Sequence, residues 1–212
     1  MERYGVKPER FTKAWFEYVW DYYKIHIIVG LVLLAAVIYT VIAITSRTEY
    51  DLFVCFSTNS QMPDQSKEKV IEELKKTVKD IDGDGEINIC VYDFPFASDY
   101  DDIEYKKALE EKFHLELQAG ESFLYVISKD VLDTIKYRSE IEGLFSSPSE
   151  WSKDVESEGE FASIQDSTIL DDANITEKDL YVGVRNYRYS EKEEKDGQKR
   201  ENAISAAKAI LE

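Results

Sequence analysis

The chain has 212 residues and a formal net charge of −17, with 43% hydrophobic and 13% aromatic residues. This composition is typical of a folded protein and excludes a disordered one. The negative charge is concentrated in residues 46–212, which carry 21 basic and 39 acidic side chains. Such a surface repels nucleic acid and anionic lipid, so neither is expected as a ligand. It favours cations or a basic partner surface, although solubility alone also explains it.

Residues 25–45, I-H-I-I-V-G-L-V-L-L-A-A-V-I-Y-T-V-I-A-I-T, contain no Asp, Glu, Lys or Arg. A helix of this length rises about 30 Å, which matches the hydrocarbon thickness of a bilayer. A cleaved signal peptide would have a shorter apolar core and a small-x-small site at its end. The run instead ends Ala43-Ile44-Thr45-Ser46. The sequence therefore predicts a signal-anchor, a single transmembrane helix that stays attached.

The charges on either side of this segment predict its orientation. Five bases lie in residues 1–24, whereas Arg47 is followed by Glu49 and Asp51. Because short cytoplasmic segments are enriched in Lys and Arg, we expect a cytoplasmic N-terminus and an extracytoplasmic domain at residues 46–212, attached to the cell membrane.

Residues 1–24 are interpreted as a cytoplasmic or interfacial helix that leads into the spanning one. Residues 11–23 are dense in aromatic side chains, which prefer the headgroup zone of a membrane. A docking face for another membrane protein is the alternative interpretation. The residues expected at the membrane interface are Trp15, Trp20, Tyr22, Tyr23, Lys24 and Arg47.

Helical and extended patterns alternate along residues 46–212. We expect strands at 51–57, 86–93, 122–128 and 180–187, and helices at 64–79, 103–119 (ending at Gly120), 131–137 and 201–211. Residues 138–178 show no clear period and are interpreted as a long excursion, and residues 191–200 as a solvated charged loop. Strands that are apolar on both faces and alternate with helices predict an α/β fold, a three-layer αβα domain with a mostly parallel sheet.

Residues 80–86, D-I-D-G-D-G-E, have the opening of a calcium-binding loop. Asp80, Asp82 and Asp84 offer oxygen ligands at alternate positions, and Gly85 occupies the sixth position. The twelfth position, which should supply a carboxylate, is Val91. The pattern predicts either a tight turn between helix and strand or a weak calcium site, and no other cofactor.

Other features of the sequence argue against catalysis. No G-x-S-x-G, H-E-x-x-H, P-loop or G-x-G-x-x-G motif is present, and acidic pairs carry little information in so acidic a chain. The two cysteines, Cys55 and Cys90, fall within strands on the side opposite Val54 and Val91, and two buried thiols are favoured over a disulfide. We expect no catalytic residues.

The stretch W-F-E-Y-V-W-D-Y-Y-K-I-H-I-I resembles membrane-anchored proteins of clostridia-like Gram-positive bacteria. The outer domains of those proteins are similar to one lobe of a type-2 extracellular solute-binding protein. Residues 50–130, with D-I-D-G-D-G-E-I-N-I-C-V and L-Q-A-G-E-S-F-L-Y-V-I-S-K-D, carry the resemblance in the domain, and D-L-Y-V-G-V-R is similar to a returning strand. Residues 138–178 are too few for a second lobe, so trapping of a solute between two lobes is not implied.

The resemblance implies the strand order 2-1-3-4 and a crevice beyond the carboxyl ends of the strands. The rim of that crevice would bind a ligand or partner and would consist of Ser57, Thr58, Asn59, Asp93, Phe94, Phe96, Lys129 and Asp130.

Location and missing motifs together predict a membrane-anchored, non-catalytic binding or interaction module. Its partners would be the membrane and other membrane or envelope proteins. The alternative is a structural or regulatory subunit of a membrane complex, which contacts its partners through the aromatic N-terminal helix.

Overall fold

The computed structural model describes residues 9–45, 49–96, 103–136, 143–153, 155–186 and 193–212. Arg47, predicted at the membrane interface, lies outside these residues. Contacts between Cα atoms divide the chain into two units, Met1–Thr48 and Glu49–Glu212.

The first unit contains one continuous helix, α1 (Lys13–Thr45), of 33 residues. Thr12 precedes it, and the amide of Trp15 donates to both the carbonyl of Thr12 at 3.0 Å and its hydroxyl at 3.3 Å, which satisfies an N–H group of the first turn. The part Lys13–Ile42 is long and apolar enough to cross a membrane, and among the described residues none of its most apolar window is buried. Because α1 rises about 50 Å, it is longer than the hydrocarbon core alone requires.

The second unit is an α/β domain built on one six-stranded sheet in the order β2-β1-β3-β6-β5-β4. Its strands are β1 (Leu52–Ser57), β2 (Ile89–Asp93), β3 (Leu124–Ser128), β4 (Ser157–Glu158), β5 (Phe161–Ile164) and β6 (Leu180–Val184). Its helices are α2 (Asp64–Lys75), α3 (Ile103–Ala119), α4 (Lys129–Ile135), α5 (Pro148–Trp151), α6 (Thr168–Asp172) and α7 (Glu193–Ile210).

The α/β class predicted from the sequence is confirmed, but the expected sheet is wrong in two respects. Strand β1 pairs in parallel with β2 and β3, whereas β6 is antiparallel to both β3 and β5, and β5 is antiparallel to β4. The sheet is therefore mixed rather than mostly parallel. Its order differs from 2-1-3-4 because β5 and β4 extend it beyond β6.

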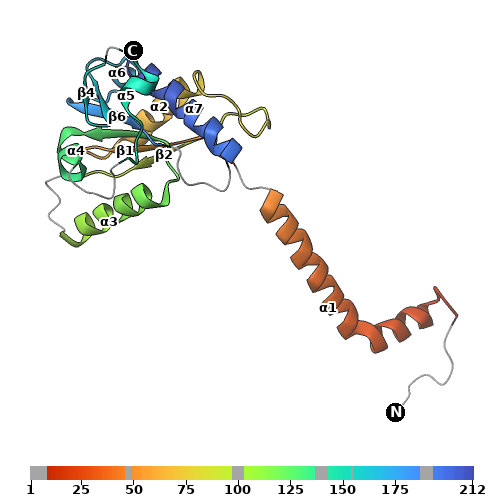
Figure 1. Cartoon of the computed structure of the whole chain (residues 1–212). Coiled ribbons are helices and arrows are strands. Elements are labelled where there is room, and N and C mark those ends of the chain that lie inside the picture. The colour runs from red at the N-terminus through yellow and green to blue at the C-terminus, as the bar shows by residue number, and fades with distance from the viewer. Residues whose placement is uncertain (1–8, 46–48, 97–102, 137–142, 154, 187–192) are drawn as a thin grey trace. The chain divides into compact units, whose positions relative to one another are not determined.

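Helices cover both faces of this sheet, and each face has its own core (Figure 1). One core packs Val54, Phe56 and Val126 against α2, α6 and α7. The other packs Cys55, Tyr125 and Ile127 against α3 and α4. Neighbouring residues belong to different cores because successive side chains of a strand point to opposite faces of the sheet.

Two segments fold differently from the interpretation of the sequence. Residues 138–178 contain α5, β4, β5 and α6, whose lengths of two to five residues are too short to show a period. The charged segment 191–200 belongs to α7 from residue 193 onward. Ala203, Ala206 and Ile210 are fully buried and dock the second half of α7. The Lys, Gln and Arg residues of its first half are good helix formers, which explains why this charged segment is helical.

Asn202 connects α7 to two distant parts of the domain. Its side chain accepts a hydrogen bond from the amide of Lys79 at 2.9 Å and donates to the Lys79 carbonyl at 2.8 Å. It also donates to the carbonyl of Asp51 at 3.2 Å. Asn202 is only 2% exposed, so these bonds hold α7, the segment after α2 and the start of β1 together inside the domain.

Candidate cation site and strand-end rim

The loop before β2 is organised by its own aspartates. Asp80 accepts hydrogen bonds from the amides of Gly83 at 2.7 Å and Gly85 at 2.9 Å. Asp82 accepts from the amide of Asp84 at 3.1 Å, and Asp84 from that of Glu86 at 2.7 Å. Gly83 and Gly85 have φ angles of +76° and +88°, which glycine adopts without strain. The loop is therefore a succession of tight turns, as the sequence predicted.

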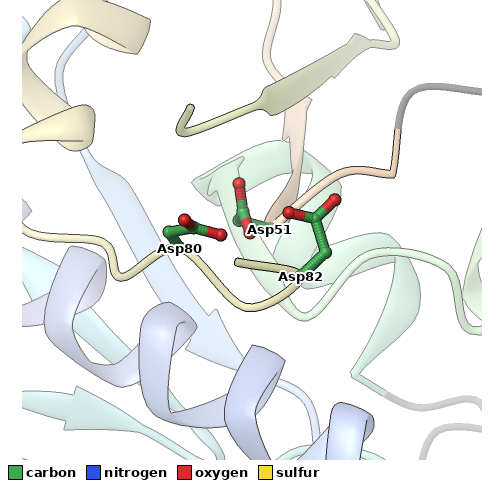
Figure 2. Close-up of side chains that lie close together, drawn as sticks. All are labelled: Asp51, Asp80 and Asp82. Carbon is green, nitrogen blue, oxygen red and sulfur yellow. The ribbon is translucent and has the colours of Figure 1, made fainter. Parts of the chain in front are cut away.

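A carboxylate from outside the loop completes this group. Asp51 immediately precedes β1, is 2% exposed, and accepts hydrogen bonds from the amides of Ile81 and Asn88, both at 2.7 Å. Its side chain points toward Asp80 and Asp82 (Figure 2), and ligand oxygens of the three residues lie within 4.8 Å of one another. Asp84, predicted as a ligand, does not belong to this group.

The surroundings of these carboxylates act in opposite directions. The amides of Gly85 and Gly83 lower the pKa of Asp80. The amide of Asp84 also lowers the pKa of Asp82, but desolvation and the neighbouring carboxyl groups of Asp84 and Asp80 raise it overall. Desolvation and the proximity of like charges both disfavour the ionised form of a carboxyl group.

Three convergent carboxylates match the ligands of a hard cation such as Ca²⁺. Asp51 would supply the carboxylate that Val91 cannot offer at the twelfth position. A loop held only by its backbone amides explains the same hydrogen bonds without a cation. Sequence reasoning missed Asp51 because it lies 29 residues before Asp80; the pairing of β1 with β2 brings it to the loop.

The predicted rim residues that follow β1 and β2 lie side by side at the carboxyl ends of these strands. The amide of Phe94 donates to the carbonyl of Phe56 at 2.8 Å, and that of Phe96 to Thr58 at 2.7 Å. The Ser57 hydroxyl donates to the Phe94 carbonyl at 3.3 Å. These bonds continue the β1–β2 pairing past both strands.

Asn59 joins the rim to two acidic residues. The backbone amide of Asn59 donates to both carboxylate oxygens of Glu177, at 3.0 and 3.1 Å. The side-chain amide of Asn59 donates to Asp130 at 3.0 Å. Desolvation raises the pKa of Glu177, the Asn59 amide opposes this change, and the charge of Asp130 adds to it. Glu177 was not predicted, because it comes from the segment before β6 that showed no period.

Asp93 is held at the end of β2 by α2 and the segment before it. One carboxylate oxygen accepts from the amide of Met62 at 3.0 Å and lies 3.2 Å from the ammonium of Lys67. The other oxygen is buried and has no hydrogen-bond partner among the described residues.

Lys129 is turned away from the other rim residues. Its ammonium bonds to Glu158 on β4, lies 3.6 Å from Asp133, and is 5.3 Å from the centre of the Tyr181 ring. Lys136 bonds to Glu158 as well, at 2.8 Å, and the two ammonium groups lower the pKa of Glu158 to about 2. Seven of the eight predicted rim residues therefore remain at the strand ends, largely bonded to one another.

The predicted interface residues of α1 are mostly exposed. Trp20, Tyr22 and Tyr23 are each about half exposed, Lys24 is exposed, and Trp15 is partly covered. Trp15 contacts the rings of its helical neighbours, and Tyr22 stacks on Tyr18 with ring centres 5.2 Å apart.

The cysteines are free thiols, with Cys55 buried and Cys90 only half-buried. Burial raises the pKa of both thiols, and the carboxylate of Glu116 adds to this effect. Neither thiol therefore has the lowered pKa of a nucleophilic cysteine.

No family model, curated protein or solved structure matches this chain. The resemblance to membrane-anchored proteins with a solute-binding-like lobe therefore stays a prediction.

Proposed function

We propose that this chain is a single-pass membrane-anchored, non-catalytic interaction module, with its N-terminus in the cytoplasm and its acidic domain outside the membrane. The observation that carries the proposal is α1, a helix long and apolar enough to cross a membrane, which precedes a separately packed domain. The bases before this stretch and the acids after it support the orientation.

The geometry of the outer domain supports binding rather than catalysis. Asp130 accepts from Asn59, Asp93 pairs with Lys67 through one of its two oxygens, and the cysteine thiols have raised pKa values. No carboxylate of the rim lies beside a described nucleophile with a lowered pKa, which supports binding over covalent catalysis. Partners of this domain would be other membrane or envelope proteins with a basic contact surface.

The alternative, a subunit that contacts its complex through the aromatic part of α1, is favoured by one observation. Phe16, Trp20, Tyr22 and Tyr23 remain about half exposed on the helix. Bilayer headgroups or a neighbouring helix would cover them equally well.

Protease accessibility tests the proposed topology. In intact cells, an added protease should degrade an epitope tag at the C-terminus and spare one at the N-terminus, while sodium carbonate extraction should leave the chain in the membrane. Protection of the C-terminal tag until the membrane is broken would contradict the orientation, and release by carbonate would contradict the anchor.

Replacement of residues 1–45 by an unrelated anchor of the same orientation distinguishes the two functions. Photo-crosslinking in the native membrane, read by mass spectrometry, should yield the same partner with both anchors if the outer domain binds it. Loss of the partner with the replaced anchor would assign the contact to α1.

A further inference from the structure

The two edges of the sheet differ in how they are protected. Strand β4 forms one edge, is two residues long, and its Glu158 is covered by two lysines. Strand β2 forms the other edge, is five residues long, and reads I-C-V-Y-D. Short length and charge are common ways to prevent a sheet edge from pairing further, and β2 has neither over its first four residues.

The hydrogen bonds of β2 show which backbone groups point away from β1. The carbonyl of Asn88 accepts from Asp51 at 2.8 Å, and the amide of Phe94 donates to Phe56. Successive residues of a strand point their backbone groups to alternate sides, so the N–H and C=O groups of Cys90 and Tyr92 also face β1. The N–H and C=O groups of Ile89 and Val91 face the outer edge, where no described strand pairs with them.

The side chains around this edge determine what could pair with it. Cys90, Val91 and Tyr92 are each half-buried and offer apolar surface on both faces. The exposed acids Asp84 and Glu86 lead into the strand, and Glu121 accepts a hydrogen bond from the Tyr92 hydroxyl at 3.0 Å. Lys67 forms an ion pair with Asp93 at the end of this strand, so its positive charge is already neutralised.

We infer that the outer edge of β2 binds an extended, basic segment of a partner protein as an additional strand. Backbone hydrogen bonds to Ile89 and Val91 would provide affinity, and lysine or arginine side chains beside Asp84, Glu86 and Glu121 would provide selectivity. A second copy of this chain fits less well, because two domains of strongly negative charge repel each other. This inference rests on the proposed interaction function and names the class of its partner.

The test uses the full chain in uncharged nanodiscs and three extended peptides of identical Val and Thr pattern with Lys, Gln or Glu at the remaining positions. Fluorescence anisotropy should show that the Lys peptide binds at least about tenfold more tightly than the Gln peptide, with weakening at high salt, and that the Glu peptide does not bind. Equal binding of all three peptides, or no binding of the Lys peptide, would overturn the inference.

Amide hydrogen exchange locates the contact without any substitution. In the free chain the amide of Val91 should exchange faster than those of Cys90 and Tyr92, and the Lys peptide should slow it selectively. Slow exchange at Val91 before peptide is added would show that the edge is already covered and would refute the inference. If exchange at Val91 slows as the concentration of the chain rises, with no peptide present, a second copy of the chain pairs with the edge instead.

A proline substitution provides a matched variant. Val91→Pro removes an outward N–H and leaves the hydrogen bonds to β1 intact, so the domain should stay folded and lose at least about tenfold in peptide affinity. Val91→Thr keeps the N–H and should bind as the parent does. If neither variant changes the affinity, the peptide binds elsewhere. If Val91→Pro abolishes peptide binding but crosslinks to the same partner as the parent, the partner does not bind at the edge of β2. The proposed interaction function would then still hold.

Discussion

Carboxylates gather at both ends of β1, but different donors hold them. At its start, Asp51, Asp80 and Asp82 accept hydrogen bonds from backbone amides, and no ion pair among the described residues includes them. At its other end, Asp93 accepts from the Met62 amide but also pairs with Lys67, and on the edge strand β4, away from β1, Glu158 pairs with Lys129 and Lys136. Backbone donors hold carboxylates in fixed positions without neutralising them, so we expect the first group to respond to cations. Ammonium donors neutralise charge, so we expect salt to weaken the second group, and the lowered pKa of Glu158 makes its ion pairs sensitive to pH.

The largest effect should come from Asp51. Asp51→Ala leaves the amides of Ile81 and Asn88 without their acceptors inside the domain, and we expect a loss of about 2–4 kcal/mol in the free energy of unfolding. Urea unfolding of the chain in nanodiscs, followed by circular dichroism, measures it. Asp84→Ala is the control, since the side chain of Asp84 is exposed and accepts a hydrogen bond from Glu86 of the same loop. Similar losses in both variants would show that burial of Asp51 does not matter.

At the opposite end of β1, Asp93→Ala should cost about 1–3 kcal/mol. The substitution leaves the Met62 amide unpaired and removes the partner of the Lys67 ammonium. Asp64→Ala is the matched control: Asp64 also lies near Lys67, at 3.7 Å, but its side chain is 98% exposed, so its removal should change the stability little. A larger loss for Asp64 than for Asp93 would contradict the assigned pairing.

Calcium should act only on the group at the start of β1. A cation bound by Asp51, Asp80 and Asp82 at tenfold excess over its Kd adds about 1.4 kcal/mol to the stability of the folded state. Thermal unfolding with calcium, with magnesium and with EDTA measures this change for the parent and for Asp82→Asn. The variant should not respond to calcium, and without calcium it should be slightly more stable because a like charge is removed. If calcium changes the stability of both proteins equally, these carboxylates bind no calcium, and the loop serves only as a tight turn.

The smallest effect should come from the ion pairs that Glu158 on β4 forms with Lys129 and Lys136. The pKa of Glu158 is lowered to about 2 in the folded domain, so its ion pairs contribute stability above the unfolded pKa of about 4.5 and lose it as the pH falls from there toward 2. Glu158→Gln should flatten the dependence of the unfolding midpoint on pH within this window.

Regular periodicity made most of the elements predictable. Strand β1 and helix α3 occur where their apolar patterns indicated, and Gly120 follows α3 with a φ of +75°. The antiparallel direction of β6 could not be predicted, because its apolar sequence L-Y-V-G-V suits either direction and the connection between β3 and β6 showed no period.

The candidate sites were predictable only where their residues are close in sequence. The Asp80–Asp84 pattern is visible as a motif, whereas Asp51 and Glu177 reach their sites through strand pairing and a returning segment. Lys129 was placed on the rim by its position after β3, but the acidic side chain of Glu158 on β4 attracts its ammonium elsewhere. Long-range partners of this kind leave no local signal in a single sequence.

The hydrogen bonds of Asn202 have a consequence for biosynthesis. Asp51 and its partner Asn202 are 151 residues apart, and a ribosome that adds about 5–20 residues per second needs roughly 8–30 s to cover that distance. Throughout this time the beginning of the sheet lacks the helix that covers it. The emerging domain therefore completes its assembly only after nearly all of it has been translated, and chaperones would have their greatest effect during that interval.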